Sequence, residues 1–368
     1  MKKTLFYMMA LGAVALTACT EEAPEPESKA SDYDYISFRS GMSSRAEETT
    51  NSNLNSIYVT AFAGDSLYFE NLNFQKGADT FFTSTPSYEW LGDTGLQYKF
   101  FAYAPSQDEL GADITTGSAD GKTAEAIKLE NFTVASEIAD QVDFVTAEAT
   151  GNRNDNESAG VELTFDHRLA QIELQAKSEN PTYDFKVTGA RIGRPQITGS
   201  FDFLTNEWTI DEWHETDVFT TSCDEVTLGA TPVSIMGKSG NAMLIPQTLV
   251  PWSPSGDPDN VAREAYLSVL VRITTKADGH VVYPFPSDTR NVEYAWASIP
   301  LSGTWEQGKK YVYILDFTEG AGNIDPDDPQ PGNPVLGGPI KFTVDVSDWT
   351  NSDIPTPMTP DLKGGSGK

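Results

Sequence analysis

The chain has 368 residues, enough for two domains of ordinary size, and 39% of them are hydrophobic. Its 54 acidic residues outnumber 25 basic ones and give a formal net charge of −29, so the surface repels nucleic-acid phosphates and anionic lipids. We therefore expect no nucleic-acid partner, and contact with a membrane only through an attached lipid.

The first residues have the order of a secretory signal. Two lysines precede an apolar run over residues 5–16, which ends in the sequence LTAC. The run is shorter than the roughly 20 apolar residues that a membrane-spanning helix needs. LTAC resembles a bacterial lipobox, in which the cysteine is acylated and becomes the mature N-terminus. We expect a lipoprotein signal peptide over 1–18 and a lipid on Cys19; the alternative is an ordinary signal peptide with a chance cysteine.

Residues 19–32 are rich in glutamate and contain two prolines, with no large apolar side chain among them. This composition predicts an acidic tether without a packed core. Acidic residues directly after a lipid-bearing cysteine also resemble the export signal that sends some Gram-negative lipoproteins to the outer face of the outer membrane. With Cys19 acylated, Cys223 has no partner, and we expect no disulfide within the chain.

Residues 35–50 read YISFRSGMSSRAEETT. Ile36 and Phe38 point to one side of a short extended segment, which can pair on a sheet edge and bury both side chains. Small and polar residues follow around Arg45 and Ala46, with nothing apolar enough to hold the backbone down. Such a loop is accessible to proteases, although a solvated arginine in a linker is the simpler interpretation.

From residue 57 onward, short apolar or alternating stretches recur between clusters of Gly, Asn, Asp and Pro. This spacing is typical of an all-β sandwich or barrel. The polar loop GNRNDNESAG at 151–160 indicates a domain boundary. We expect an N-terminal β-sandwich domain over 33–160, a C-terminal one over 161–349, and a flexible tail over 350–368.

The last strand has the clearest alternation in the chain. Its apolar side chains point to one face and its polar ones to the other, which predicts one buried and one solvated face. We expect the apolar side chains to be buried either in this chain's own core or, as a donated strand, in a neighbour's; they are Ile340, Phe342, Val344 and Val346.

The sequence offers little for catalysis. None of its three histidines lies near a second ligand at metal-binding spacing. It contains no G-x-S-x-G nucleophile elbow and no glycine-rich phosphate loop after a strand. We therefore expect no enzymatic activity, no metal and no cofactor.

Two weaker patterns have structural interpretations that we favour. Asp325, Asp327 and Asp328 resemble part of a calcium loop, but the glycine and the full set of ligands are missing, which favours a solvated loop. The seven tryptophans could include a platform for stacking sugars, but tryptophans in a disulfide-free sandwich more often pack in the core.

Four stretches taken together resemble the fimbrillin family, the subunits of type V fimbriae of Gram-negative anaerobes. They follow the family's order along the chain and are LTFDHRLAQIEL (163–174), MLIPQTL (243–249), WEQGKKYVYIL (305–315) and PIKFTVDVSDW (339–349). The resemblance implies two tandem transthyretin-like β-sandwich domains, export as a lipoprotein and assembly by strand exchange. It also implies cleavage by an arginine-specific protease just after the first strand, where Arg45 matches and Arg39 is the competing choice.

The resemblance therefore implies a structural or adhesive fimbrial subunit, surface-exposed on the cell outer membrane and, after processing, part of the fimbrium. Its partners would be other fimbrial subunits, the arginine-specific protease, and a host glycan or protein. Two other functions stay open at this point. One is a surface glycan-binding lipoprotein that serves an outer-membrane importer, and the other is a hydrolase.

Overall fold

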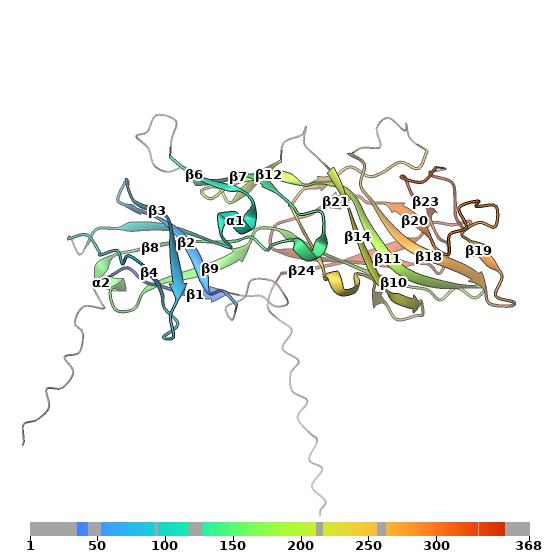
Figure 1. The fold of residues 1–368 in the computed structure, drawn as a ribbon, viewed down its shortest axis with the longest axis horizontal. Helices are drawn as coiled ribbons and strands as arrows, with labels where there is room; N and C mark the ends of the chain where they lie inside the picture. The colour runs from blue at the N-terminus through green and yellow to red at the C-terminus, as the bar shows by residue number, and fades with distance from the viewer. Residues whose placement is uncertain are drawn as a thin grey trace, which may run out of the picture.

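The computed structural model describes residues 35–42, 53–92, 95–117, 127–210, 216–255, 263–329 and 331–349. Nearly all regular structure in these ranges is β-strand, which confirms the predicted all-β class. The molecule is elongated, with the N-terminal half of the chain at one end and the C-terminal half at the other (Figure 1). No helix in the described part is long and apolar enough to cross a membrane. The predicted signal peptide, tether and tail lie outside the described residues, and so does Cys19.

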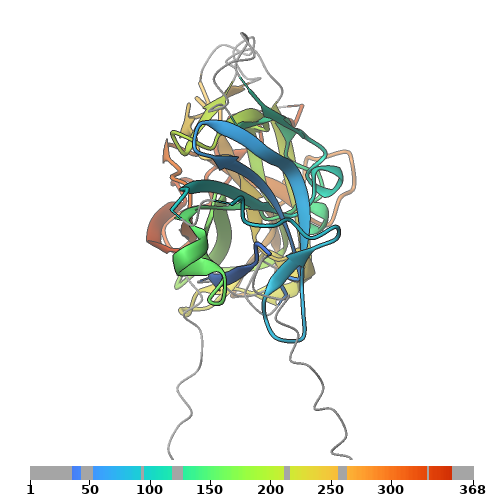
Figure 2. The same cartoon turned by 90° about the vertical axis from the view of Figure 1, so that its left-hand side faces the viewer.

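In the described part of the N-terminal half, strands close into a barrel, seen from its end in Figure 2. In the order β1-β4-β3-β2-β5-β8-β9 around the barrel, they are β1 Phe38–Met42, β4 Phe82–Ser84, β3 Ser66–Lys76, β2 Ser56–Ala63, β5 Tyr98–Ala104, β8 Val145–Gly151 and β9 Val161–His167. Because side chains alternate along each strand, one set points inward. Ile57, Val59, Phe74 and Phe100 of that set are completely buried in one apolar cluster.

The barrel changes the expected domain boundary. The predicted boundary between residues 160 and 161 would separate β9 from the barrel that it completes, because β9 pairs with β1 and β8. The polar loop 151–160 instead holds a single helical turn, α2 Arg153–Asn156. The side chain of Asn152 caps this turn by accepting the backbone N–H of Asp155.

The C-terminal half contains two sheets whose inner faces share one apolar cluster. The first has the order β15-β10-β22-β24, with β16 also on β10, and consists of β10 Ala170–Lys177, β15 Val233–Ser234, β16 Ala242–Leu244, β22 Lys309–Asp316 and β24 Lys341–Asp348. The second has the order β14-β11-β18-β20-β23, with β19 on β18, and consists of β11 Tyr183–Gln196, β14 Thr216–Thr227, β18 Tyr266–Thr275, β19 Val281–Tyr283, β20 Ala295–Pro300 and β23 Asn323–Ile324.

A further sheet joins the two halves of the chain along one side of the molecule (Figure 1). Its order is β13-β12-β7-β6, with β6 Asp113–Thr116, β7 Ile127–Thr133, β12 Thr198–Asp202 and β13 Glu207–Ile210. β7 pairs with β12 across about 70 residues of sequence, with Thr133 opposite Thr198. Below the sheet, the rings of Phe144 and Phe201 meet edge to face at 5.4 Å. The two halves therefore share packing.

The remaining elements are short. They are the two-stranded sheet of β17 Thr248–Leu249 and β21 Gly303–Thr304, the helix α1 Gln107–Leu110, and the 3-10 turns Ile138–Asp140 and Gly237–Ser239. The turn α1 begins at Ser106, whose side chain accepts the backbone N–H of Glu109 while that carboxylate accepts the N–H of Ser106.

Candidate functional site

The strand β1, dark blue in Figure 2, is attached unequally to its two neighbours in the barrel. It runs parallel to β9 over five residue pairs, from Phe38 opposite Val161 to Met42 opposite Phe165. On its other side, a single antiparallel pair with β4 joins Phe38 to Phe82. β9 in turn pairs with β8 only at its C-terminal end, beyond the stretch that β1 covers. The short strand β1 is therefore the main partner of the first part of β9.

The side chains of this segment are inside the barrel. Ile36 is 1% exposed and Phe38 is fully buried, so the structure buries both residues that the alternation assigns to one face. The ring of Phe38 lies edge to face against Phe74 at 4.8 Å and Phe100 at 5.1 Å. The backbone N–H of Ile36 donates to the carbonyl of Tyr88 at 2.8 Å. Loss of the segment would uncover aromatic rings and leave one edge of β9 unpaired.

The two arginines near this segment are placed differently. Arg39 lies within β1, where its backbone pairs with Glu162 and its guanidinium carbon lies 5.6 Å from the centre of the Phe81 ring. Arg45 and Ala46 lie outside the described residues, three and four positions after the end of β1 at Met42.

The closing strand β24 differs from its prediction. It pairs with β22 over its full length and ends the order of its sheet. Ile340 is buried, Phe342 and Val344 are half-buried, and Val346 is 55% exposed. Burial in this chain's own core, the first of the two predicted alternatives, therefore holds for Ile340 and not for Val346. The alternation correctly places the apolar residues on one face, but the facing sheet does not cover the far end of this edge strand.

Directly after β24, Trp349 closes the described part of the chain against the junction between its two halves. It is 4% exposed, and its ring stacks on His167 with 4.2 Å between centroids and 7° between planes. His167, the last residue of β9, holds Nδ1 3.0 Å from a carboxylate oxygen of the buried Asp143. The backbone N–H of Trp349 donates to the carbonyl of Gly308 at 2.8 Å. The sequence offers no signal for this docking, because the two rings and the one carboxylate come from three separate segments of the chain.

Asp325 is not in a solvated loop, contrary to the expectation from the sequence. It is 1% exposed, and its Oδ2 accepts the hydroxyls of Ser268 at 2.6 Å and Ser298 at 3.2 Å. Its Oδ1 lies 3.6 Å from the guanidinium of Arg191, which stacks 4.0 Å over the ring of Trp296. These contacts hold the chain after β23 against the outer face of the sheet that contains β11, β18 and β20. The described residues contain no group of three or more His, Cys, Asp or Glu that could hold a metal ion.

Most of the tryptophans that the structure describes are packed inside it. Four of them are buried and two are half-buried, and Trp213 lies outside the described residues. The buried ones are Trp90, Trp252, Trp305 and Trp349, and the half-buried ones are Trp208 and Trp296. Core and corner packing, the favoured interpretation, therefore holds for the described part of the chain.

This architecture defines an all-β protein made of a closed barrel joined to a pair of packed sheets, with its most distinctive feature in the short strand that closes the barrel. A fimbrillin-like family model matches residues 44–349, and the chain belongs to that family. The match begins at the residue before Arg45. No protein with a curated description matches the chain.

Several solved structures of Bacteroides proteins are similar to this chain. A fimbrial protein from Bacteroides vulgatus aligns with a TM-score of 0.58 at 16% identity, over 86% of this chain and 100% of that one. Proteins assigned to cell adhesion from Bacteroides uniformis and Bacteroides ovatus align with TM-scores of 0.45, at 15% and 16% identity. They cover 86% and 87% of this chain, and 98% and 99% of theirs. At these identities, the first of these likenesses establishes a shared fold.

Proposed function

We propose that this protein is a structural or adhesive subunit of a type V fimbria, exported as a lipoprotein and assembled by protease-triggered strand exchange. Membership of the fimbrillin-like family supports a fimbrial or adhesive role at the cell surface. The observation that carries the exchange is the position of β1: it closes the barrel, supplies five pairs to β9, and has one pair on its other side. The alternative, glycan capture for an importer, loses the tryptophan platform that suggested it.

The cleavage would act by freeing the place of β1 in the barrel for a strand of another chain. Cutting after β1 leaves the strand joined to the barrel by non-covalent contacts alone: its pairs with β9 and β4, the bridge of Tyr35 to Glu89, and the backbone hydrogen bonds of Ile36 and Ser37. Once it departs, the groove between β4 and β9 exposes apolar side chains and unpaired backbone groups, which another chain's strand can satisfy. Backbone hydrogen bonds would supply affinity, and alternate side chains entering the sites of Ile36 and Phe38 would set the register.

Arg45 suits this cleavage better than Arg39 does. A protease binds its substrate as an extended backbone that is free to enter the active-site cleft. Arg39 is in the middle of β1, paired with Glu162, so cutting there would require the strand to leave first. Cleavage after Arg45 would release β1 as a whole and make Ala46 the new N-terminus.

The donated strand is a separate part of the proposal. β24 has the better pattern for donation than the proline-containing tail after Trp349, but it makes eight residue pairs with β22, all of which donation would break. Its outer edge and the exposed Val346 make β24 equally suited to receive a strand that extends the sheet.

The cleavage is tested on purified precursor with an arginine-specific protease. We expect a new N-terminus at Ala46, followed by oligomers that survive mild heating in detergent, because inserted strands are held by a full ladder of hydrogen bonds. The Arg45→Ala variant should stay monomeric, and the matched control Arg39→Ala should be cut and should assemble like the wild type. Arg45→Ala protein that polymerises at the wild-type rate would show that this arginine is not the switch.

The lipid anchor has its own test. We expect Cys19→Ala to accumulate as uncleaved precursor or to leave the membrane, because the acylated thiol provides the anchor and removal of the signal depends on it. Detergent-phase partitioning and the mass of the mature chain measure both effects. A Cys223→Ala control should behave as wild type. If Cys19→Ala has the mature mass and partitioning of the wild type, the anchor is elsewhere.

A further inference from the structure

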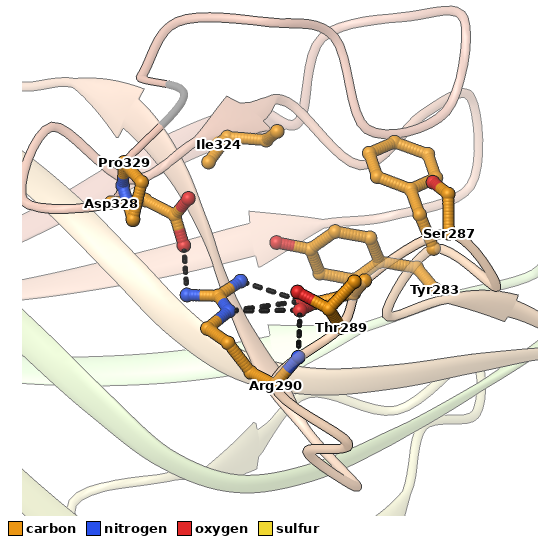
Figure 3. A pocket seen from close by; sticks show the side chains of 9 residues that line it. Tyr283, Ser287, Thr289, Arg290, Ile324, Asp328 and Pro329 are labelled. Carbon is orange, nitrogen blue, oxygen red and sulfur yellow. Dashed lines mark hydrogen bonds and ion pairs between the residues drawn. The ribbon is translucent and has the colours of Figure 1, made fainter.

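A cavity of about 320 Å³ opens at the end of the molecule opposite the barrel. It lies between the loop after β19, residues 284–294, and the loop after β23, residues 325–329 (Figure 3). We propose that this cavity binds a single neutral sugar ring, as a free saccharide or as a unit of a larger glycan. The proposal does not depend on strand exchange, since β1 and β24 take no part in the cavity.

One wall of the cavity is aromatic and rigid. The ring of Tyr283 is buried, and its hydroxyl donates to the carbonyl of Trp296 at 2.7 Å, so the ring cannot turn away. Phe285 is half-buried and lies edge to face against Tyr283, with ring centroids 5.2 Å apart. The buried side chain of Ile324 extends the apolar surface. Tyr283 and Ile324 are 2% and 5% exposed and back this wall, so the half-buried Phe285 supplies the surface that can meet the apolar C–H face of a pyranose ring.

A second wall of the cavity is a fixed set of hydrogen-bonding groups centred on Arg290 (Figure 3). Its guanidinium donates through Nε and Nη2 to the carboxylate of Asp288 and through Nη1 to Asp328 at 2.6 Å. Both carboxylates are nearly covered, with 14% and 13% of their side chains exposed, whereas 45% of the arginine side chain is exposed. The hydrogen bonds from Arg290 lower the pKa of Asp288, which keeps the pair charged.

The groups in this wall suit hydroxyls. Each terminal nitrogen of the Arg290 guanidinium carries a second N–H, which leaves fixed donors, whereas both oxygens of Asp288 already accept hydrogen bonds from the Arg290 side chain and backbone. The acceptors near these donors are the hydroxyls of Ser287 and Thr289. A sugar hydroxyl donates and accepts at once, and neighbouring hydroxyls on a ring can bridge such a pair. The exposed Ser287 and Thr289 add hydroxyls at the rim of the cavity.

Charge and size exclude other ligand classes. Two carboxylates around one guanidinium leave a local charge of about −1, in a chain of formal charge −29, which disfavours anions. A cation would have to compete with Arg290 for carboxylates that are already paired. A purely apolar ligand would displace water from the charged wall. It would offer no hydrogen bonds in place of those that the wall makes with water. The volume is at the lower end of the range for small-molecule sites, which suits one ring.

Saturation-transfer NMR with the full chain in detergent tests the site, with glucose, galactose, mannose and N-acetylglucosamine as separate probes. We expect transfer to at least one of them, with a Kd that is nearly independent of salt because the ligand is neutral. Phe285→Ala should weaken binding about tenfold or more by removing the stacking wall. Arg290→Gln should do the same by removing charge-assisted donors, and Arg290→Lys should restore only part of the affinity.

Two further variants separate binding from folding. Thr289→Trp fills the mouth of the cavity from an exposed position without touching the ion pairs, and should abolish binding at an unchanged unfolding midpoint. Arg153→Gln is the control for loss of an arginine ion pair away from the cavity. It breaks the pair between Arg153 of α2 and Glu157, which are 3.0 Å apart, and the variant should bind sugar as the wild type does. The proposal is overturned by absence of transfer to all four sugars, by unchanged binding in Phe285→Ala and Thr289→Trp, or by affinity that falls steeply with salt.

Discussion

Replacing Phe38 with alanine is expected to lower the free energy of unfolding of the uncleaved protein by about 3–5 kcal/mol. The side chain is fully buried and contacts two aromatic rings edge to face, so its loss removes apolar burial and leaves a cavity in the barrel. A loss of this size is a large part of the total stability of a typical domain. Denaturant unfolding of the precursor, followed by tryptophan fluorescence, measures it.

Leu67→Ala is the matched control, because Leu67 belongs to the same barrel on β3 but is 44% exposed. Its effect should stay within about 0.5 kcal/mol. The proposed cleavage adds a second condition: once β1 is released, polymers made from the Phe38→Ala protein should be as stable as wild-type polymers, because residue 38 is no longer part of them. Polymers weakened by this change would mean that β1 stays in place, which contradicts the exchange.

Replacing Asp325 with alanine is expected to cost about 2–4 kcal/mol, although a sequence-based interpretation places this residue in a solvated loop. Its carboxylate accepts two buried serine hydroxyls and the backbone N–H of Asp327 at 2.9 Å, and it lies opposite Arg191. Hydrogen bonds to a charged group are stronger than neutral ones, and truncation leaves their buried donors with fewer partners. Thermal and denaturant unfolding of the purified variant measure the loss.

Two controls accompany this change. Asp325→Asn keeps the shape and one acceptor oxygen while removing the charge, so it should cost less than alanine does. Asp345→Ala removes an aspartate from the exposed face of β24 and should change stability by no more than about 0.5 kcal/mol. Equal effects for Asp325→Ala and Asp345→Ala would show that the buried cluster contributes nothing to stability.

The all-β class was predictable because alternation with a period of two is a local property of the sequence. The stretches 57–62 and 161–165 lie within strands of the structure, and 311–317 lies within one except for its last residue. The inward face of the first segment was predictable for the same reason, since Ile36 and Phe38 are two residues apart and both are buried. The family resemblance was readable from short motifs spread over the chain, and the family model confirms it.

Other features required the tertiary structure, because they depend on which distant segments meet. The parallel pairing of β1 with β9 spans more than 100 residues, so nothing local places residues 161–167 in the first half of the molecule. The candidate sugar cavity combines an aromatic wall from the loop after β19 with Asp328 from the loop after β23. The sequence shows aromatic and polar residues in the first loop and aspartates in the second, but not that Arg290 joins the two loops.

The sequence by itself therefore determined which residues face the same way along each strand, since backbone geometry imposes that alternation. Only the tertiary structure decided which of those faces are covered. Val346 and Ile340 share a face and a pattern, yet one is 55% exposed and the other 4%, because the facing sheet reaches one end of the edge strand and not the other. Asp325 is the opposite example, a polar residue that is buried. Its burial is possible because two serines donate hydrogen bonds to its carboxylate and Arg191 lies beside it, all three from other strands.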